Sequence, residues 1–545
     1  MTSRNAISGR AISRRSLIST AAVAAAAPVV PATAAAGGGT LRIAMTAADI
    51  PTTHGIPNNG FEGVRFLGYQ PYDALVNWDL RNNPDKPATI VPGLFTSWHP
   101  DETNPLKWTF AVRQGVKFHD GTDFNADAVI WNLRRIYDEK SPQYDAQSAP
   151  IVKASVSMVD TFEKVDESTI AITTKYPFSF LPWVLIRVFI VSPTQWEKTG
   201  KNWAEFAKNP MGTGPFKIVR VVPGQYVEMA RNEDYWDKNR VPKLEKLFVY
   251  PMAEATTRIA ALRSNQVDWI EVPAPDSIDS LKAAGYNVIL WPYPHTYPYA
   301  LNTLEDSPFH DVRVRQAINY ALDREGLCKL INNIATPAVG LYKPTDKYFG
   351  TPTEKYTYDP EKAKALLKEA GYGPDKPVKA KIMISTSGSG QMLPIPMNEF
   401  VQQNMKASGI ELEFDVVEWG TMLVAIRSDP KAPPSHGDHG INISLSSIEP
   451  STMFRYYAID SFSPTNWNWG HFASEKATAA LRKAQSTFDE AEQTKLLAEA
   501  HTIVVDEAAW LFMCHDLNPR AMSKKVHGFQ PVQSWFVDLT TVTVS

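Results

Sequence analysis

Apolar side chains recur at every second position in some stretches of the chain and at helical spacing in others. Trp108, Phe110 and Val112 show the first pattern, which predicts a strand with one buried face. Gly115 follows at the turn of a predicted hairpin. Residues 129–136 then carry apolar side chains three and four positions apart, as the buried face of a helix requires. Strands and helices therefore follow one another at short intervals.

The same succession continues toward the C-terminus. Apolar runs bounded by turn residues predict strands over 41–45, 267–272, 379–385 and 410–419. Amphipathic stretches predict helices over 254–264, 311–323, 359–370, 474–485 and 489–505. This order is typical of α/β lobes, and the 545 residues are enough for two or three lobes of about 100–200 residues each.

The charge balance argues against a nucleic-acid partner. The formal net charge is −3, and the first 39 residues contain four arginines and no acidic residue, so the rest of the chain is more acidic still. A mildly acidic protein lacks the basic surface that binds nucleic acid or anionic lipid.

The N-terminus predicts an export signal. Ser13-Arg14-Arg15-Ser16-Leu17-Ile18 is similar to a twin-arginine motif, and an apolar run over 17–30 and small residues up to position 36 follow it. The apolar run is shorter than the ~20 residues of a membrane-spanning helix, and no cysteine stands near the expected cleavage site. We therefore expect residues 1–36 to be a cleaved signal peptide and the mature protein to lie in the periplasm, without a lipid anchor or a membrane-inserted segment.

Motifs of nucleophilic, metal-dependent or phosphate-binding enzymes do not appear in the sequence. There is no Gly-x-Ser-x-Gly elbow and no His-Glu-x-x-His helix. Gly212-Thr213-Gly214 lacks the Lys-Ser/Thr pair of a phosphate loop, and His436 and His439 lack a third ligand at a recognisable spacing. Cys328 and Cys514 are expected to be separate buried thiols. We expect no catalysis, cofactor or metal, and a secreted amidase or peptidase is the alternative from another class.

Five longer stretches resemble, in order, the landmarks of the family 5 extracytoplasmic solute-binding proteins of ABC importers for peptides, oligopeptides and nickel. The first two are the most specific, with the sequences LKWTFAVRQGVKFHDGTDFNADAVIWNLRRI and NPMGTGPFKIVRVVPGQYVEMARNEDYW. The five stretches are residues 106–136, 209–236, 258–270, 302–325 and 358–372. The resemblance covers nearly the whole chain after the predicted signal peptide.

The resemblance implies an α/β, bilobal periplasmic-binding-protein type II fold with an extra accessory subdomain in the first lobe. Two strands that cross between the lobes, near 299–302 and near 515, would form the hinge. The implied divisions are 40–76, 210–300 and 515–545 for the first lobe, 77–209 for the accessory subdomain and 301–514 for the second lobe.

The function that the resemblance implies is capture of a solute. A monomeric periplasmic receptor would close its two lobes over a short peptide or peptide-like solute. It would then deliver the solute to the membrane permease, which works with a cytoplasmic ATPase. A non-peptide solute, such as an oligosaccharide, an opine or an amino-acid conjugate, remains the alternative.

Several aromatic and polar residues occupy positions that face the ligand in this family. Trp419 is similar to the tryptophan that lines the cleft of peptide-binding members. Tyr297 and Tyr299 fall on the first crossing strand, and His515 and Asp516 fall on the returning one. Packing in the core or at the hinge is the alternative for each of them.

One position departs from the pattern of the peptide-binding relatives. These carry an aspartate three residues before an acidic-Pro pair to hold the α-ammonium of the peptide, and here the corresponding residue is Ser446, before Glu449-Pro450. A serine cannot supply the charge-assisted hydrogen bond that a desolvated cation needs. Either Asp49, Glu449 or Asp516 does this work, or the ligand is not a peptide with a free amino end.

Two tryptophans complete the candidate site. Trp467 and Trp469 alternate with asparagines in the sequence Asn-Trp-Asn-Trp, a pairing of amide and indole groups that suits sugars or opine-like solutes. A packed surface loop is the alternative.

Overall fold

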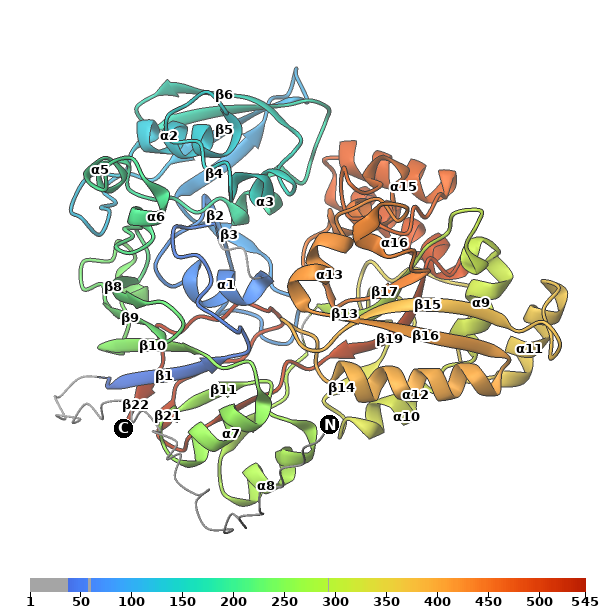
Figure 1. The fold of residues 1–545 in the computed structure, drawn as a ribbon. Coiled ribbons are helices and arrows are strands. Elements are labelled where there is room, and N and C mark those ends of the chain that lie inside the picture. Colours follow the sequence, from blue (N-terminus) through green and yellow to red (C-terminus); the bar gives the residue numbers. More distant parts are fainter. Residues whose placement is uncertain (1–37, 57–59, 293) are drawn as a thin grey trace, which may run out of the picture. The chain divides into compact units, whose positions relative to one another are not determined.

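The computed structural model describes residues 38–56, 60–292 and 294–545, and three β-sheets organise this part of the chain (Figure 1). The first sheet has the strand order β12-β20-β11-β1-β10-β9-β8. Its strands are β1 (Thr40–Met45), β8 (Phe216–Val222), β9 (Tyr226–Arg231), β10 (Lys246–Pro251), β11 (Trp269–Glu271), β12 (Asn287–Ile289) and β20 (Arg520–Met522). The predicted signal peptide lies outside the described residues.

Helices cover both faces of the first sheet because β1 is apolar on both sides. Leu41, Ile43 and Met45 pack with residues of α1 (Gly60–Leu67), whereas Ala44 packs with residues of α7 (Ala255–Arg263) and α8 (Ile278–Ala283). Figure 1 shows α1 and α7 on opposite sides of β1. β1 is parallel to β10 and β11, as expected of a strand with helices on both faces.

The second sheet has the strand order β14-β19-β13-β17-β15-β16, with β18 paired to β13. Its strands are β13 (His295–Leu301), β14 (Ala335–Pro337), β15 (Val378–Ser385), β16 (Ile410–Val417), β17 (Gly440–Asn442), β18 (Leu445–Ser446) and β19 (Trp510–Asp516). The accompanying helices are α9 (Val312–Tyr320), α10 (Arg324–Leu330), α11 (Pro360–Glu369), α12 (Pro394–Ala407), α13 (Trp419–Ala425), α14 (Thr452–Tyr457), α15 (Glu475–Ser486) and α16 (Glu490–Asp506).

A third, antiparallel sheet of order β4-β5-β7-β6 lies within residues 95–174. Its strands are β4 (Phe95–Pro100), β5 (Lys107–Val112), β6 (Val159–Asp166) and β7 (Thr169–Thr174). The helices of this part of the chain are α2 (Ala126–Tyr137), which packs on β6, and α3 (Ala149–Lys153), α4 (Leu181–Val184), α5 (Pro193–Lys198) and α6 (Trp203–Phe206). Two strand pairs complete the pairing, β2 (Val76–Trp78) with β3 (Ile90–Pro92) and β21 (Val526–His527) with β22 (Thr543–Val544). Single 3-10 turns occur at Leu185–Arg187, Lys238–Arg240, Pro275–Ser277, Pro308–His310, Pro433–Ser435 and Ile459–Ser461.

The main chain passes between the first and second sheets at two places. It leaves β12 at Ile289 and enters β13 at His295, and it returns from β19 at Asp516 to β20 at Arg520. The expected lobe boundaries at 300/301 and 514/515 fall inside β13 and β19, which are full members of the second sheet. The segments that join the two sheets are therefore residues 290–294 and 517–519, a few positions away from the implied boundaries.

Most predicted elements appear with small shifts at their ends. Trp108, Phe110 and Val112 form the buried face of β5, and Asn125 caps α2 by accepting a hydrogen bond from the amide of Ala128. The predicted strand 410–419 is too long, because β16 ends at Val417 and Trp419 is instead the first residue of α13. The predicted helix 311–323 ends at Tyr320, after which α10 begins.

Two further findings concern chemistry and membranes. Cys328 and Cys514 are both buried, as expected, and no bond joins them in the described residues. Among the described residues, no helix combines the length and the apolar character that crossing a bilayer requires.

Candidate functional site

A cavity of about 260 Å³ lies between two groups of segments. The first group comes from residues 55–189 and 535–536, and the second comes from residue 295 and residues 389–467. One wall comes from α3, from the 3-10 turn Leu185–Arg187 and from Trp535 and Phe536 near the C-terminus. The opposite wall comes from β13, β18, α13 and α14 and includes Ser446. Segments that are distant in the sequence meet here, as in ligand sites at the interface of two domains.

Aromatic rings form much of both walls. Trp535 is stacked with His295 at a centroid distance of 5.5 Å, and Phe536 lies 4.9 Å from Tyr69. On the opposite wall, Trp419 and Trp467 line the cavity and are half-buried. Flat apolar surfaces on two sides suit a solute with an apolar or planar body.

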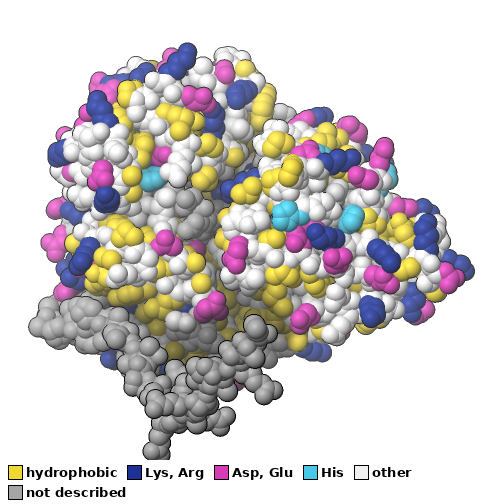
Figure 2. Space-filling view, in the orientation of Figure 1, with side chains coloured by type: hydrophobic (Ala, Val, Ile, Leu, Met, Phe, Trp, Pro, Cys, Tyr) yellow, Lys and Arg dark blue, Asp and Glu magenta, His cyan; other side chains and the backbone are white. Residues whose placement is uncertain are grey.

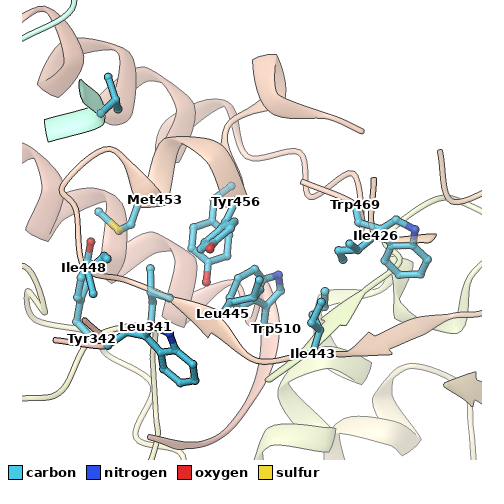
Figure 3. Close-up of a cluster of buried hydrophobic side chains, with 14 of the residues drawn as sticks. Leu341, Tyr342, Ile426, Ile443, Leu445, Ile448, Met453, Tyr456, Trp469 and Trp510 are labelled. Carbon is cyan, nitrogen blue, oxygen red and sulfur yellow. The ribbon is translucent and has the colours of Figure 1, made fainter. Parts of the chain in front are cut away.

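The wall near β18 is the edge of a hydrophobic cluster. Figure 3 shows Ile443, Leu445 and Tyr456 in one group of buried side chains with Trp510. The first three also line the cavity, and the rings of Tyr456 and Trp510 lie 5.3 Å apart. The cavity wall is therefore continuous with the core, so its side chains have little freedom to move.

Two glycines allow the aromatic wall to pack on the backbone. A Cβ atom added to Gly388 would lie 2.5 Å from the ring of Trp419, and one added to Gly390 would lie 2.7 Å from the ring of His295. Gly390 also has a φ of +73°, a conformation that disfavours other residues. These glycines fix where the rings of Trp419 and His295 lie.

Three arginines line the cavity, and one buried glutamate stands behind two of them. Arg187 donates to Glu449 Oε1 at 2.5 Å, and Arg455 donates to the same oxygen at 3.3 Å. The side chain of Glu449 is only 1% exposed. Arg427 is exposed at the rim, where its guanidinium lies 5.1 Å from the centre of the Trp467 ring.

Burial and repulsion between neighbouring guanidinium groups lower the pKa values of two of these arginines. Burial, and then the positive charge of Arg187, lowers the pKa of Arg455 from its ordinary value. Although Arg427 is exposed, partial loss of hydration beside the cavity wall, and then the charge of Arg455, lower its pKa from the ordinary value. Burial, together with the charge of Arg65, lowers the pKa of His295 to about 3, so this ring is neutral near pH 7. The cavity therefore carries excess positive charge that comes from arginine alone.

Comparison with known proteins decides the class of this site. Residues 89–469 match the model of the bacterial extracellular solute-binding proteins, family 5. The chain belongs to this family. The Di/tripeptide-binding protein 2 of Pseudomonas aeruginosa is 27% identical over 494 residues, which are 86% of this chain and 90% of that protein. The glutathione-binding protein GsiB of Salmonella typhi is 29% identical over 434 residues, which are 78% and 80% of the two chains.

A solved structure agrees with this assignment. The periplasmic binding protein DppA of Helicobacter pylori, in complex with the peptide STSA, matches with a TM-score of 0.78 at 23% identity, over 93% of this chain and 98% of that one. The match confirms the expected α/β fold of the periplasmic-binding-protein type II class.

In this family 5 chain, the structure brings together four of the predicted site residues. Trp419, Ser446 and Trp467 line the cavity, and Glu449 lies directly behind Arg187 and Arg455. Ser446 is buried in β18, where it pairs with His295 of β13.

Three predicted aromatic residues lie in the core instead of the cavity wall. Tyr297 and Tyr299 are fully buried in β13, where the hydroxyl of Tyr299 donates to Asn398. The indole of Trp469 donates to Ser435 Oγ at 3.1 Å, and Figure 3 shows Trp469 beside Ile426. β13 is buried on both faces, so its alternating pattern does not distinguish ligand-facing from core-facing positions.

The remaining predicted residues also lie outside the cavity lining. Asp49 is exposed and accepts from the amide of Gly224 at 2.9 Å. Asp516 is buried at the end of β19 and accepts from the amide of Asn518 at 2.6 Å. His515 is buried in the same strand, and burial, followed by the charge of Lys343, lowers its pKa to about 3.

Sequence reasoning missed the arginines and the second aromatic wall. Arg187 is the one charged residue in the apolar run 180–191, and a single cation in such a run signals a buried ion pair. Trp535 and Phe536 carry no such signal, because only the fold brings the C-terminal segment to the cavity.

Of the two histidines considered as metal ligands, the structure places one, His436, beside two carboxylates. Asp415 on β16 lies with His436 and Asp438, with possible ligand atoms within 4.8 Å of one another. The ammonium of Lys381 is 3.2 Å from Asp438 and 3.9 Å from Asp415. His439 does not join the group, because its Nδ1 accepts from the amide of Lys381. A lysine already compensates these carboxylates, so the group carries no metal assignment.

Proposed function

We propose that this protein is the periplasmic receptor of an ABC importer, and that it binds a short peptide or peptide-like solute without changing it chemically. The observation that carries the proposal is the cavity between α3, the turn Leu185–Arg187 and Trp535–Phe536 on one side and β13, β18, α13 and α14 on the other, with aromatic rings and charged groups on both sides. Ligand contact with both walls would favour a closed arrangement over an open one.

The proposed lobes follow the two main sheets. The first lobe carries β1, β8–β12 and β20, with residues 77–209 as its accessory subdomain, and the second lobe carries β13–β19. The segments after Ile289 and after Asp516 are the proposed hinge. We expect a monomer, exported by the signal of residues 1–36, whose closed form is recognised by the permease.

Trp419, Ser446 and Trp467 are the proposed solute contacts among the residues predicted from the sequence. Asp49, Tyr297, Tyr299, Trp469, His515 and Asp516 remain predictions without a place in the cavity lining. Peptide binding is supported by the names of the relatives with 27% and 29% identity, which are di/tripeptide and glutathione receptors.

The decisive experiment is mass spectrometry of the small molecules that gently purified protein releases on denaturation, combined with small-angle scattering before and after their return. Release of a defined solute and a more compact particle in its presence are the expected results. Conversion of the solute into a product would contradict a receptor role, and an unchanged scattering curve would contradict closure.

Surface charge is consistent with a solute receptor. Figure 2 shows acidic and basic side chains interspersed over one face of the described residues. A mixed surface of this kind does not attract nucleic acid.

A further inference from the structure

The charges at the cavity do not balance. Arg187, Arg427 and Arg455 line it, and Glu449 is the carboxylate that pairs with the first and the third of them. One glutamate offsets one of three guanidinium groups and leaves two positive charges beside the cavity. Cations that are partly removed from water require an anion or a strong acceptor.

No carboxylate is placed to receive an ammonium group. Among the described residues that line the cavity there is no aspartate and no glutamate. Ser446 stands where the peptide-binding motif has an aspartate, and neither Asp49 nor Asp516 lines the cavity. Oε2 of Glu449 has no hydrogen-bond partner among the described residues, but the two arginines on Oε1 already compensate its charge.

Two of the arginines have unused donors. Nε of Arg455 is buried and lacks a hydrogen-bond partner in the described part of the chain. Arg427 makes no ion pair among those residues and rests against the Trp467 ring, which also lies 5.5 Å from Arg455. Two guanidinium groups near one indole, close enough for the charge of Arg455 to act on Arg427, can receive one carboxylate, which arginine binds with two parallel hydrogen bonds.

We propose that this cavity selects an anionic, carboxylate-bearing solute that lacks a free ammonium group, with the carboxylate on Arg427 and Arg455 and an apolar or aromatic body between Trp419 and the Trp535–Phe536 wall. An amino-blocked acidic peptide or an acylated amino acid has this chemistry. The inference rests on the proposed receptor function and narrows its ligand class.

Three matched pools of dipeptides test the inference with the mature protein. The first holds N-acetylated acidic dipeptides with an aromatic residue, the second the same dipeptides with free amino ends, and the third the acetylated compounds with all carboxylates converted to amides. Binding is measured by calorimetry and by the shift in unfolding temperature. We expect the acetylated acids to bind about tenfold to 100-fold more tightly than the other two pools.

The outcomes separate this inference from the proposed function. Tighter binding of the free amino forms would overturn the inference and leave a peptide receptor. Tighter binding of the amides than of the acids would contradict the proposal that Arg427 and Arg455 bind a carboxylate. If none of the pools binds, the ligand is not a peptide-like solute of this kind. Both the inference and the proposed ligand class are then contradicted.

A variant at the rim tests the arginines directly. Arg427→Gln should weaken binding of the acetylated acids about tenfold and leave binding of the amides unchanged, because only the carboxylate is affected. Arg427→Lys should recover part of the loss, since it restores the charge without the paired donors. Arg482→Gln is the matched control, because Arg482 is exposed and pairs with Asp460 at 2.6 Å, outside the cavity. Equal effects of the Arg427 and Arg482 variants would contradict the inference.

Discussion

Two groups of one glutamate and two arginines occur in this molecule, and their surroundings differ. The closed cluster consists of Arg65, Glu271 and Arg520, whose side chains are at most 1% exposed. Both oxygens of Glu271 are used, since Arg65 bonds to Oε2 and Arg520 lies 3.1 Å from Oε1. The indole of Trp269 donates to Oε1 at 2.7 Å. Each arginine thus has its own oxygen of the carboxylate, and the one net positive charge of the cluster is enclosed.

The cleft cluster consists of Arg187, Glu449 and Arg455 and opens onto the cavity. Both arginines share one oxygen of Glu449, and they are 16% and 11% exposed. Arg427 adds a third cation at the rim. Arginine and glutamate side chains therefore have different roles in the two clusters. In the closed cluster the remaining positive charge is enclosed and the ion pairs hold parts of the fold together, whereas in the cleft cluster it lies, with that of Arg427, beside a cavity that a ligand can enter.

Loss of the carboxylate from the closed cluster should have the largest effect. Glu271→Gln would leave two enclosed arginines without a counter-ion, and we expect the free energy of unfolding to fall by about 3–5 kcal/mol. The measurement is denaturant unfolding at neutral pH. Burial raises the pKa of Glu271, but Arg65 and Arg520 hold it below its usual value, so the carboxylate is charged there. A loss below about 1 kcal/mol would mean that the cluster is not enclosed as described.

Removal of an aromatic wall tests the cleft side of the comparison. Trp419→Ala should weaken solute binding by about 1–3 kcal/mol and leave the fold intact, because this ring is half-buried at the cavity. Trp469→Ala is the matched control, since Trp469 is buried in the core and its loss should reduce stability by about 3–5 kcal/mol. Calorimetric titration and thermal unfolding of both variants separate the two effects. Unchanged affinity of the Trp419 variant would place that ring outside the site.

Loss of the carboxylate from the cleft cluster should cost less than its loss from the closed cluster. Glu449→Gln should lower the free energy of unfolding by about 1–3 kcal/mol, because water reaches Arg187 and Arg455 and can solvate them. The same change should strengthen binding of an anionic solute, since it removes a competing negative charge. Weaker binding of every solute would show instead that Glu449 itself holds the ligand. Unfolding curves and titrations with the dipeptide pools provide both readings.

Most helices and strands of the fold could be predicted from local patterns in the sequence. The alternation in β5 and the apolar spacing in α2 and α11 are decided by neighbouring residues, and these elements were predicted well. The end of β16 was missed because two more residues that strands favour, Val417 and Trp419, follow its alternation, although Trp419 already belongs to a helix. Pattern alone cannot place such a boundary.

The site was less predictable because it depends on contacts between distant segments. Arg187 and Glu449 are 262 positions apart, so their pairing follows from the fold and from no local spacing. Tyr297 and Tyr299 lie on the expected strand, but that strand is buried on both faces. Ser446, by contrast, was found because one position departed from a known motif.

Protonation of His295 should have the smallest effect, and it connects the two clusters. This ring lines the cavity and stacks on Trp535, and the guanidinium of Arg65 also lies 3.7 Å from the centre of the Trp535 ring. Burial and then Arg65 lower the pKa of His295 to about 3, whereas an unfolded histidine has a pKa of about 6.5.

The stabilising contribution of neutral His295 is therefore fully present above about pH 6.5 and is lost as the pH falls from there toward 3. Between pH 7 and 5.5 the loss is about 1 kcal/mol for this one group, and other buried histidines add to the total. His295→Gln should flatten the pH dependence of the unfolding midpoint by that amount, whereas His99→Gln, at an exposed position, should not. Identical pH profiles for the two variants would mean that His295 gains its proton equally in the folded and unfolded states, and that the positive field of the closed cluster does not extend to the cavity.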